Sequence, residues 1–257
     1  MRIIFTLFVC IFCIQSTFSQ EIKEDKSYLN SISRDRVLVE LNYTGWDTDY
    51  QFSNEIFTVD ENNDTTFTTN LTDLKQKWFN RGLNLYFMWD IALGDKKSSN
   101  FAFAPGLGIS MHNVYSNAQM VSFQNDSTTF RSLENVSRRN NKLATAHIEV
   151  PLELRFRSNP DKFSRSWKVA AGLRLGMIIS KNAKFKGNVL DENGNTITVK
   201  TKNLDVKGFS QYRIGPSLRV GYGNVSLVGF VALTDLFEAN KGPKINQFSI
   251  GITFNSF

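Results

Sequence analysis

The chain has 257 residues, of which 13% are aromatic, and a formal net charge of +6. Its basic residues are interspersed with acidic ones, so the charge pattern excludes a nucleic-acid-binding protein. No run of about 18 apolar residues follows the N-terminal segment, which excludes a helical membrane protein. The aromatic content is high for a soluble domain, so the membrane class left to consider is a β-barrel.

The first nineteen residues have the layout of a secretory signal peptide. An apolar stretch from Ile3 to Ile14 is too short to span a bilayer, and Thr17-Phe18-Ser19 fits a cleavage site. Cleavage removes Cys10 and Cys13, the only cysteines, so we expect no disulfide framework and no thiolate metal site. Lipid attachment at Cys13 is the alternative, but residues 9–12 lack the small side chains expected there. We expect a signal peptide at 1–19, a periplasmic N-terminal segment at 20–35 and a barrel domain at 36–257.

Eight later segments alternate large apolar side chains with small, polar or charged ones, the period-2 pattern of a strand with two unlike faces. In the second segment, for example, Leu83 and Leu85 lie on the apolar parity and Asn84 on the mixed one. The segments lie at 37–43, 79–89, 101–111, 148–156, 167–179, 212–222, 225–233 and 248–254.

The connections between these segments alternate in length. Long links at 47–76, 113–144 and 181–206 are separated by short ones around 94–100, 158–166 and 223–224, and the seventh link, at 234–244, is intermediate. Transmembrane barrels have short periplasmic turns and long outer loops. We therefore predict an all-β fold, an eight-stranded antiparallel transmembrane up-and-down β-barrel with long outer loops, short periplasmic turns and both termini in the periplasm.

A soluble barrel of lipocalin type, with the apolar parity facing inward, is the competing fold. Three observations favour the membrane: the alternating loop lengths, the aromatic residues at strand ends, and a mixed face rich in glycine and alanine. Pro105, Pro151 and Pro216 fall inside predicted strands, where each removes a ladder hydrogen bond. We expect bulges or local breaks at these prolines.

Two motifs resemble those of a known family. Ile-Glu-Val-Pro-Leu-Glu-Leu-Arg-Phe at 148–156 resembles the fourth-strand motif of the outer-membrane β-barrel family common in Bacteroidetes, which includes PorT-like proteins. Phe-Ser-Ile-Gly-Ile-Thr-Phe at 248–254 is similar to the family's ending, and Gln20 after the signal is usual in that group. The resemblance implies an integral protein of the cell outer membrane. PorT-like proteins assist type IX secretion, but no motif of this chain singles out that role.

Charged residues of both signs fall on the inward parity. An eight-stranded barrel has room for side chains but not for a wide channel, and unpaired charges in a narrow lumen are costly. We therefore predict a structural ion-pair network that fills the lumen, with a gated pore or small-ligand conduit as the alternative. The network comprises Glu40, Glu149, Glu153, Arg155, Arg174, Arg213 and Arg219.

A smaller polar group lies on the same inward parity near the outer ends of adjacent strands. Ser110, His112 and His147 could face one another if the hairpin is in register. In that arrangement they would suit a Ser-His-acid hydrolase or a weak metal site. Because no nucleophile motif is present, we interpret them instead as ordinary polar residues of the lumen.

The predicted outer loops are rich in Asn, Asp, Ser and Thr and are interpreted as solvated. Asp-Thr-Thr at 64–66 and Asp-Ser-Thr at 126–128 resemble short O-glycosylation sites of Bacteroidetes, with Thr65 and Ser127 as acceptors. Asn193-Gly194 between β-forming residues predicts a hairpin, so the fifth link should extend as a two-stranded arm. A similar arm is expected in the third link, around 119–131.

These observations favour a non-enzymatic outer-membrane barrel, either an accessory subunit of an envelope or secretion complex or a surface-recognition protein. A narrow conduit and an outer-membrane hydrolase are the alternatives. We expect no catalytic residues, no cofactor and no metal. Outer-membrane lipid and other envelope or secretion-machinery proteins are the expected partners, and nucleic acid is not.

Overall fold

The computed structural model describes residues 37–59, 65–94, 99–123, 126–132, 137–159, 165–190, 196–204 and 206–255, all within one unit, Arg34–Phe257. The predicted signal peptide and periplasmic segment lie outside the described residues. Within the described ranges, no helix is long and apolar enough to cross a membrane.

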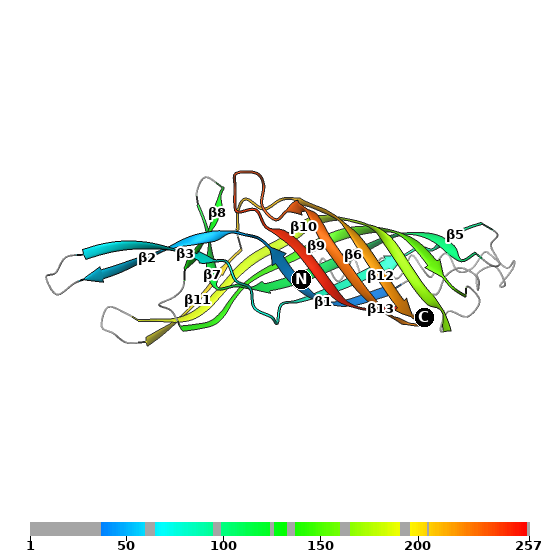
Figure 1. Cartoon of the computed structure of the whole chain (residues 1–257), viewed down its shortest axis with the longest axis horizontal. Helices are drawn as coiled ribbons and strands as arrows, with labels where there is room; N and C mark the ends of the chain where they lie inside the picture. Colours follow the sequence, from blue (N-terminus) through cyan, green and yellow to red (C-terminus); the bar gives the residue numbers. More distant parts are fainter. Residues whose placement is uncertain are drawn as a thin grey trace, which may run out of the picture. The chain divides into compact units, whose positions relative to one another are not determined.

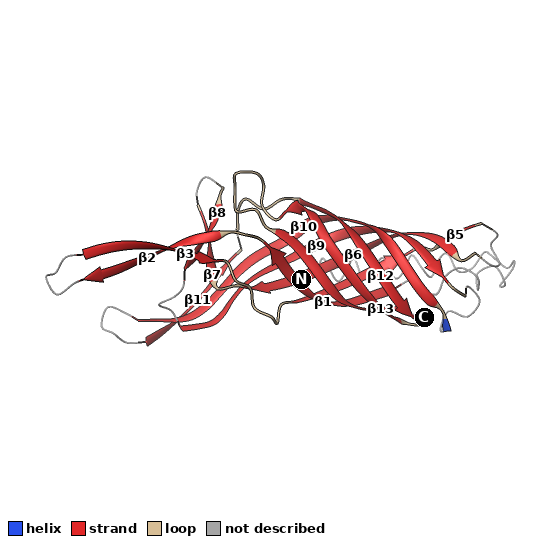
Figure 2. Ribbon diagram, viewed as in Figure 1, coloured by secondary structure: helices blue, strands red, loops and turns tan. Residues whose placement is uncertain are grey.

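Eight strands of the described chain form a closed antiparallel ring (Figures 1 and 2). In ring order they are β1 (Val37–Asp47), β4 (Arg81–Met88), β6 (Phe101–Tyr115), β9 (Ser137–Arg157), β10 (Trp167–Leu190), β12 (Tyr212–Tyr222), β13 (Val225–Asp235) and β14 (Asn246–Asn255). Pairing of β1 with β14, from Leu38↔Asn255 to Asp47↔Asn246, closes the ring. The predicted eight-stranded up-and-down barrel is therefore confirmed.

The two parities of each strand face opposite environments. Along β4 the residues alternate strictly between exposed and buried, with Leu83 and Leu85 outward and Asn84 and Tyr86 inward. The apolar parity is the outward one, as in a membrane barrel, and the soluble barrel with an apolar interior is excluded.

Each of the three strand prolines coincides with a break or an end in a ladder. Opposite Pro151, pairing of β6 with β9 omits Gly106 and Leu107 and then continues in the same register. Opposite Pro105, β4 stops and β5 (Ile91–Leu93) resumes the same register on β6. The β12–β13 ladder begins only after Pro216. The expected local breaks are present because proline has no N–H to donate.

The longest strands continue well past the barrel at the end opposite the chain's described termini. β9 and β10 remain paired up to Asn188↔Ser137, and β11 (Thr196–Asn203) pairs with β10 from Asn203 to Thr196. We call the three-stranded extension formed by residues 137–145, 180–190 and 196–203 the outer sheet. It contains the arm predicted for the fifth link, whose Asn193-Gly194 turn lies outside the described residues.

Two further hairpins lie at the same end of the barrel (Figure 1). β7 (Ala118–Ser122) pairs with β8 (Thr128–Ser132), as expected around 119–131. β2 (Gln51–Val59) pairs with β3 (Thr65–Asp73), so Thr65 and Thr66, expected in a solvated loop, belong to a paired strand. The Ile-Phe-Thr-Val and Thr-Thr-Phe-Thr-Thr runs are β-branched and aromatic, which favours paired strands.

A pair of single-cysteine variants tests which face meets lipid, because both native cysteines lie in the predicted signal segment. Leu227 is 66% exposed and its neighbour Val228 is 4% exposed. We expect Leu227→Cys in lipid vesicles to react with a lipid-soluble maleimide at least about tenfold faster than Val228→Cys, because period-2 alternation places them on opposite faces. Faster labelling of Val228→Cys would instead mean that the apolar face is inward.

Candidate functional site

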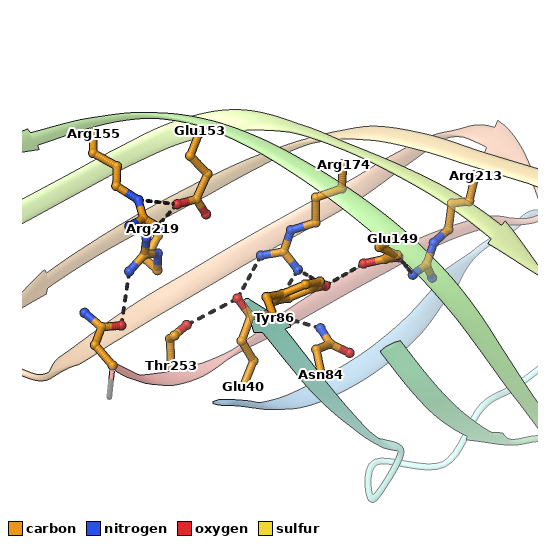
Figure 3. Close-up of polar contacts among 11 residues, drawn as sticks. Glu40, Asn84, Tyr86, Glu149, Glu153, Arg155, Arg174, Arg213, Arg219 and Thr253 are labelled. Carbon is orange, nitrogen blue, oxygen red and sulfur yellow. Dashed lines mark hydrogen bonds and ion pairs between the residues drawn. The ribbon is translucent and has the colours of Figure 1, made fainter. Parts of the chain in front are cut away.

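The centre of the lumen is occupied by an ion pair between strands that face each other across the barrel. Arg174 of β10 donates from Nη1 to Glu40 Oε2 and from Nη2 to Glu40 Oε1, each at 2.9 Å, so the pair is bidentate (Figure 3). Asn84 Nδ2 also donates to Glu40 Oε2 at 2.9 Å. Both charged side chains are almost fully buried, and each has hydrogen-bonding partners that offset the loss of water.

Tyr86 joins this central pair to a second one nearer the outer end. Its hydroxyl accepts from Arg174 Nη1 at 3.0 Å and donates to Glu149 Oε2 at 2.5 Å, and Glu149 in turn is paired with Arg213. The ring of Tyr86 lies directly over Gly108, its register partner, where an added Cβ would overlap the ring. Glycine at position 108 therefore gives the tyrosine its place in the lumen.

A separate cluster occupies the lumen toward the periplasmic turns. Glu153 Oε2 accepts from Arg219 Nη2 at 2.6 Å and from Arg155 Nε at 2.9 Å. Asp90 extends the cluster, because its carboxylate forms ion pairs with both Arg155 and Arg157. A pocket of about 10 Å³, whose lining includes Arg155 and Arg219, has room for about one water molecule.

The seven residues predicted for the network are all buried, and the structure brings them into these two clusters. The outer cluster contains Glu40, Arg174, Glu149 and Arg213, and the inner one Glu153, Arg155 and Arg219. Sequence reasoning missed Tyr86 and Arg157 as members. Parity alone would have found both, because Tyr86 alternates with Asn84, and Arg157 follows Arg155 on the inward face.

Ser110, His112 and His147 are buried close together, but Arg213 takes the position that a hydrolase would need for its base. Arg213 Nη2 donates to Ser110 Oγ at 3.0 Å and contacts His112 Nε2 at 3.1 Å. Because a guanidinium only donates, His112 Nε2 accepts, and its Nδ1 carries the proton toward Thr44 Oγ1, 2.8 Å away.

The two histidine rings lie with their centroids 6.1 Å apart. Among the hydrogen bonds of the described residues, none joins Ser110 to either histidine, whereas a serine nucleophile needs such a bond to its base. Across the described part of the chain there is also no group of three His, Cys, Asp or Glu side chains suited to hold a metal ion.

At the outer end of the barrel, loops and strand ends enclose a hydrophobic core. Phe130 lies at its middle, with ring centroids 6.1 Å from Trp46, 5.9 Å from Tyr50 and 6.4 Å from Phe237. The buried members are Trp46, Phe52, Val114, Ala118, Met120, Phe130, Leu143, Val206, Phe209, Leu236, Phe237 and Ile245. We call the described parts of 46–76, 114–145, 178–209 and 234–246, which are built around this core, the outer platform. Sequence reasoning had predicted solvated loops and two-stranded arms in these links, but no hydrophobic core shared among them.

The two predicted glycosylation positions lie on the hairpins of the outer platform. Thr65 begins β3, opposite Val59 of β2, and Ser127 lies between β7 and β8 with its carbonyl accepting from Phe123 N at 2.8 Å. The preceding Asp126 forms an ion pair with Lys207 at 2.8 Å, and this ammonium lowers the pKa of the Asp126 carboxyl. Modification at Thr65 and Ser127 stays a prediction.

A closed antiparallel barrel with an apolar outer face, a charged lumen and long loops at one end defines the class of transmembrane β-barrels. Within that class, the chain belongs to the outer membrane protein beta-barrel domain family, which matches residues 62–238. The predicted outer-membrane family and location are thereby supported, whereas membership of the PorT-like subgroup stays a prediction. No curated protein matches the sequence.

Solved structures similar to the chain include two of Ail, the attachment invasion locus protein of Yersinia pestis. One, in complex with the heparin analogue sucrose octasulfate, has 10% identity and a TM-score of 0.30 and covers 85% of this chain and 96% of that chain. The other has 12% identity and a TM-score of 0.31 and covers 85% and 95% of the two chains. TM-scores this low transfer no function.

The buried pair of Glu40 and Arg174 makes a prediction about stability. Glu40→Gln keeps the side-chain volume but leaves the Arg174 charge uncompensated, so we expect a loss of about 3–5 kcal/mol of unfolding free energy. The double variant Glu40→Met, Arg174→Met should be more stable than Glu40→Gln, because it leaves no buried charge unpaired. The measurement is urea unfolding in lipid vesicles followed by tryptophan fluorescence.

The matched control is Glu238→Gln, which removes the carboxylate of an exposed ion pair with Lys241. Solvent screens that pair, so its loss should leave the unfolding midpoint unchanged. Equal effects of Glu40→Gln and Glu238→Gln would contradict a structural role for the central pair.

Proposed function

We propose that the protein is a non-enzymatic outer-membrane barrel that anchors the outer platform and uses it to bind a partner macromolecule. The partner is either an envelope or secretion complex, in which the protein is an accessory or structural subunit, or a molecule recognised at the cell surface. The hydrophobic core of the platform is the observation that carries the proposal, because it orders links that barrel closure alone does not require.

A folded platform suits partner binding for a thermodynamic reason. Ordering a loop on binding costs conformational entropy, so a surface that is already ordered binds with a smaller penalty. The platform is tied together over long sequence distances, as in the hydrogen bond of Thr128 Oγ1 to Lys207 O at 2.7 Å and the bridge of Phe209 with Phe237. These links favour a preformed surface.

The lumen geometry weighs against the conduit and the hydrolase. The Arg174–Glu40 pair and Tyr86 cross the barrel at its centre, where a conduit would need open space. Ser110 is engaged by Arg213, which cannot act as a general base because it stays protonated. A filled lumen is therefore more consistent with an anchor than with transport or catalysis.

Conductance distinguishes an anchor from a conduit. We expect the wild-type protein in planar bilayers to show no ion-conducting steps, because paired side chains occupy the lumen. A variant with Glu40→Ala, Tyr86→Ala and Arg174→Ala should show them, because it removes the side chains that cross the centre. Steps of equal size in both proteins would support the conduit instead.

Crosslinking from intact outer membranes tests the partner. We expect the wild-type protein to recover one partner in fixed ratio, crosslinked to the platform, as identified by mass spectrometry. Phe130→Ala should lose this partner, since Phe130 is buried in the platform core. The matched control is Phe230→Ala, an equally buried phenylalanine in the lumen between Arg174 and Arg213, which should keep it.

Each variant must keep the barrel, which is checked by the shift in gel mobility between unheated and heated samples. A partner retained equally by Phe130→Ala would overturn the proposed function. A solitary wild-type barrel would exclude the accessory subunit and leave recognition of a molecule at the cell surface.

A further inference from the structure

The outward face of the outer sheet carries lysines that stand directly opposite one another. Lys184 of β10 has Lys142 of β9 as its register partner on one side and Lys202 of β11 on the other, and Lys186 pairs with Lys200. Residues two apart on a strand share a face, so all five side chains lie on one surface, which we call the lysine face. Adjacent positions are about 4.8 Å apart across strands and about 6.6 Å apart along them.

The positive charges on this face repel one another. Like charges directly opposite across strands are destabilising. The described residues of the outer sheet contain no Asp or Glu. The opposite face of the sheet packs against the rest of the platform, because Leu143 and Phe185 are buried and Ala183 packs against the platform core. Within the described outer sheet, the lysine face therefore has no carboxylate to neutralise its charge, as expected if an anionic group outside the chain binds there.

The lysine face continues the lipid-facing surface of the same two strands. From Phe156 to Ala146, the outward side of β9 rises about 25 Å for a strand tilted by about 40°, which is the height of the apolar band of such barrels. Lys142 lies four residues further from the membrane than Ala146 on the same strand, about 10 Å higher. That level lies at the headgroups of the outer leaflet.

The position of the Lys142 side chain points to the membrane as the source of the anion. Lys142 pairs with Tyr115 in the ladder, yet its Nζ donates at 2.8 Å to Oδ1 of Asn113, two residues closer to the membrane on β6. The ammonium also lies 5.6 Å from the centre of the Tyr115 ring. The lowest lysine of the face thus leans toward the lipid surface, not toward the tip of the sheet.

We propose that Lys142, Lys184, Lys186, Lys200 and Lys202 bind the phosphate groups of glycolipid headgroups in the outer leaflet. Ammonium groups are suited to phosphate, and their spacing lets two or three reach one headgroup. Bound lipid would neutralise the face and hold the outer sheet against the membrane surface. The lysine face belongs to the outer platform, but lipid binding there does not depend on the partner proposed for the platform.

The test compares lipid retention by two variants of equal charge. The patch variant is Lys184→Gln, Lys200→Gln, Lys202→Gln. The matched control is Lys75→Gln, Lys77→Gln, Lys244→Gln, three lysines at the same end of the barrel outside the outer sheet. Native mass spectrometry of the purified full chain in detergent counts bound diphosphorylated lipid A, the same lipid without phosphates, and phosphatidylethanolamine.

We expect the wild-type protein and the control to retain diphosphorylated lipid A and to bind the other two lipids weakly. The patch variant should bind the phosphorylated lipid about a hundredfold more weakly, for the loss of three surface charges. Retention by the patch variant at the wild-type level, or an equal loss in the control, would overturn the proposal. So would displacement of the lipid by soluble dextran sulfate at lower concentration than by free lipid A, which would assign the face to a polyanionic glycan.

Discussion

Closure of the sheet between β1 and β14 is the constraint on which the rest of the structure depends. Backbone groups in a bilayer have no water to bond, so a sheet can cross it only when no edge is left open. Closing eight strands leaves a lumen that side chains fill. The same step therefore sends the apolar parity to lipid and forces charges such as Glu40 and Arg174 to find partners inside.

The lumen and the outer platform are held together by different kinds of contact. Inside the barrel, charge-assisted hydrogen bonds through Tyr86 connect strands from opposite sides of the ring. Above the barrel, apolar packing connects Phe130 of β8 to Trp46 of β1 and to Phe237. The barrel thus presents the platform from a base fixed by eight strands, and the proposed binding of a partner needs no movement of the lumen.

The barrel was predictable because lipid on one side and the lumen on the other impose an alternation of apolar and polar residues along each strand. Leu83, Asn84 and Leu85 reveal their faces by alternation alone, and the charged lumen residues follow from the same parity. The platform core was not predictable in this way, because the burial of Phe130 depends on its packing against Trp46 and Phe237, which are distant in the chain. Ring-crossing partners were also hidden, because parity says that Ser110 faces inward but not that Arg213 reaches it.

The ladders differ in the sequence separation of the strands that they join, and this difference suggests an order of assembly. β9 and β10 are joined by a short link and stay paired from Lys168↔Arg157 to Asn188↔Ser137, with register shifts after Ile178 and after Lys186, so their pairing needs little loop closure. The β1–β14 seam joins residues such as Glu40 and Thr253, 213 positions apart, and its closure costs about 2–3 kcal/mol more in chain entropy than that of a short hairpin. We therefore expect the central hairpin to form early and the seam to be the last ladder to gain protection from hydrogen exchange.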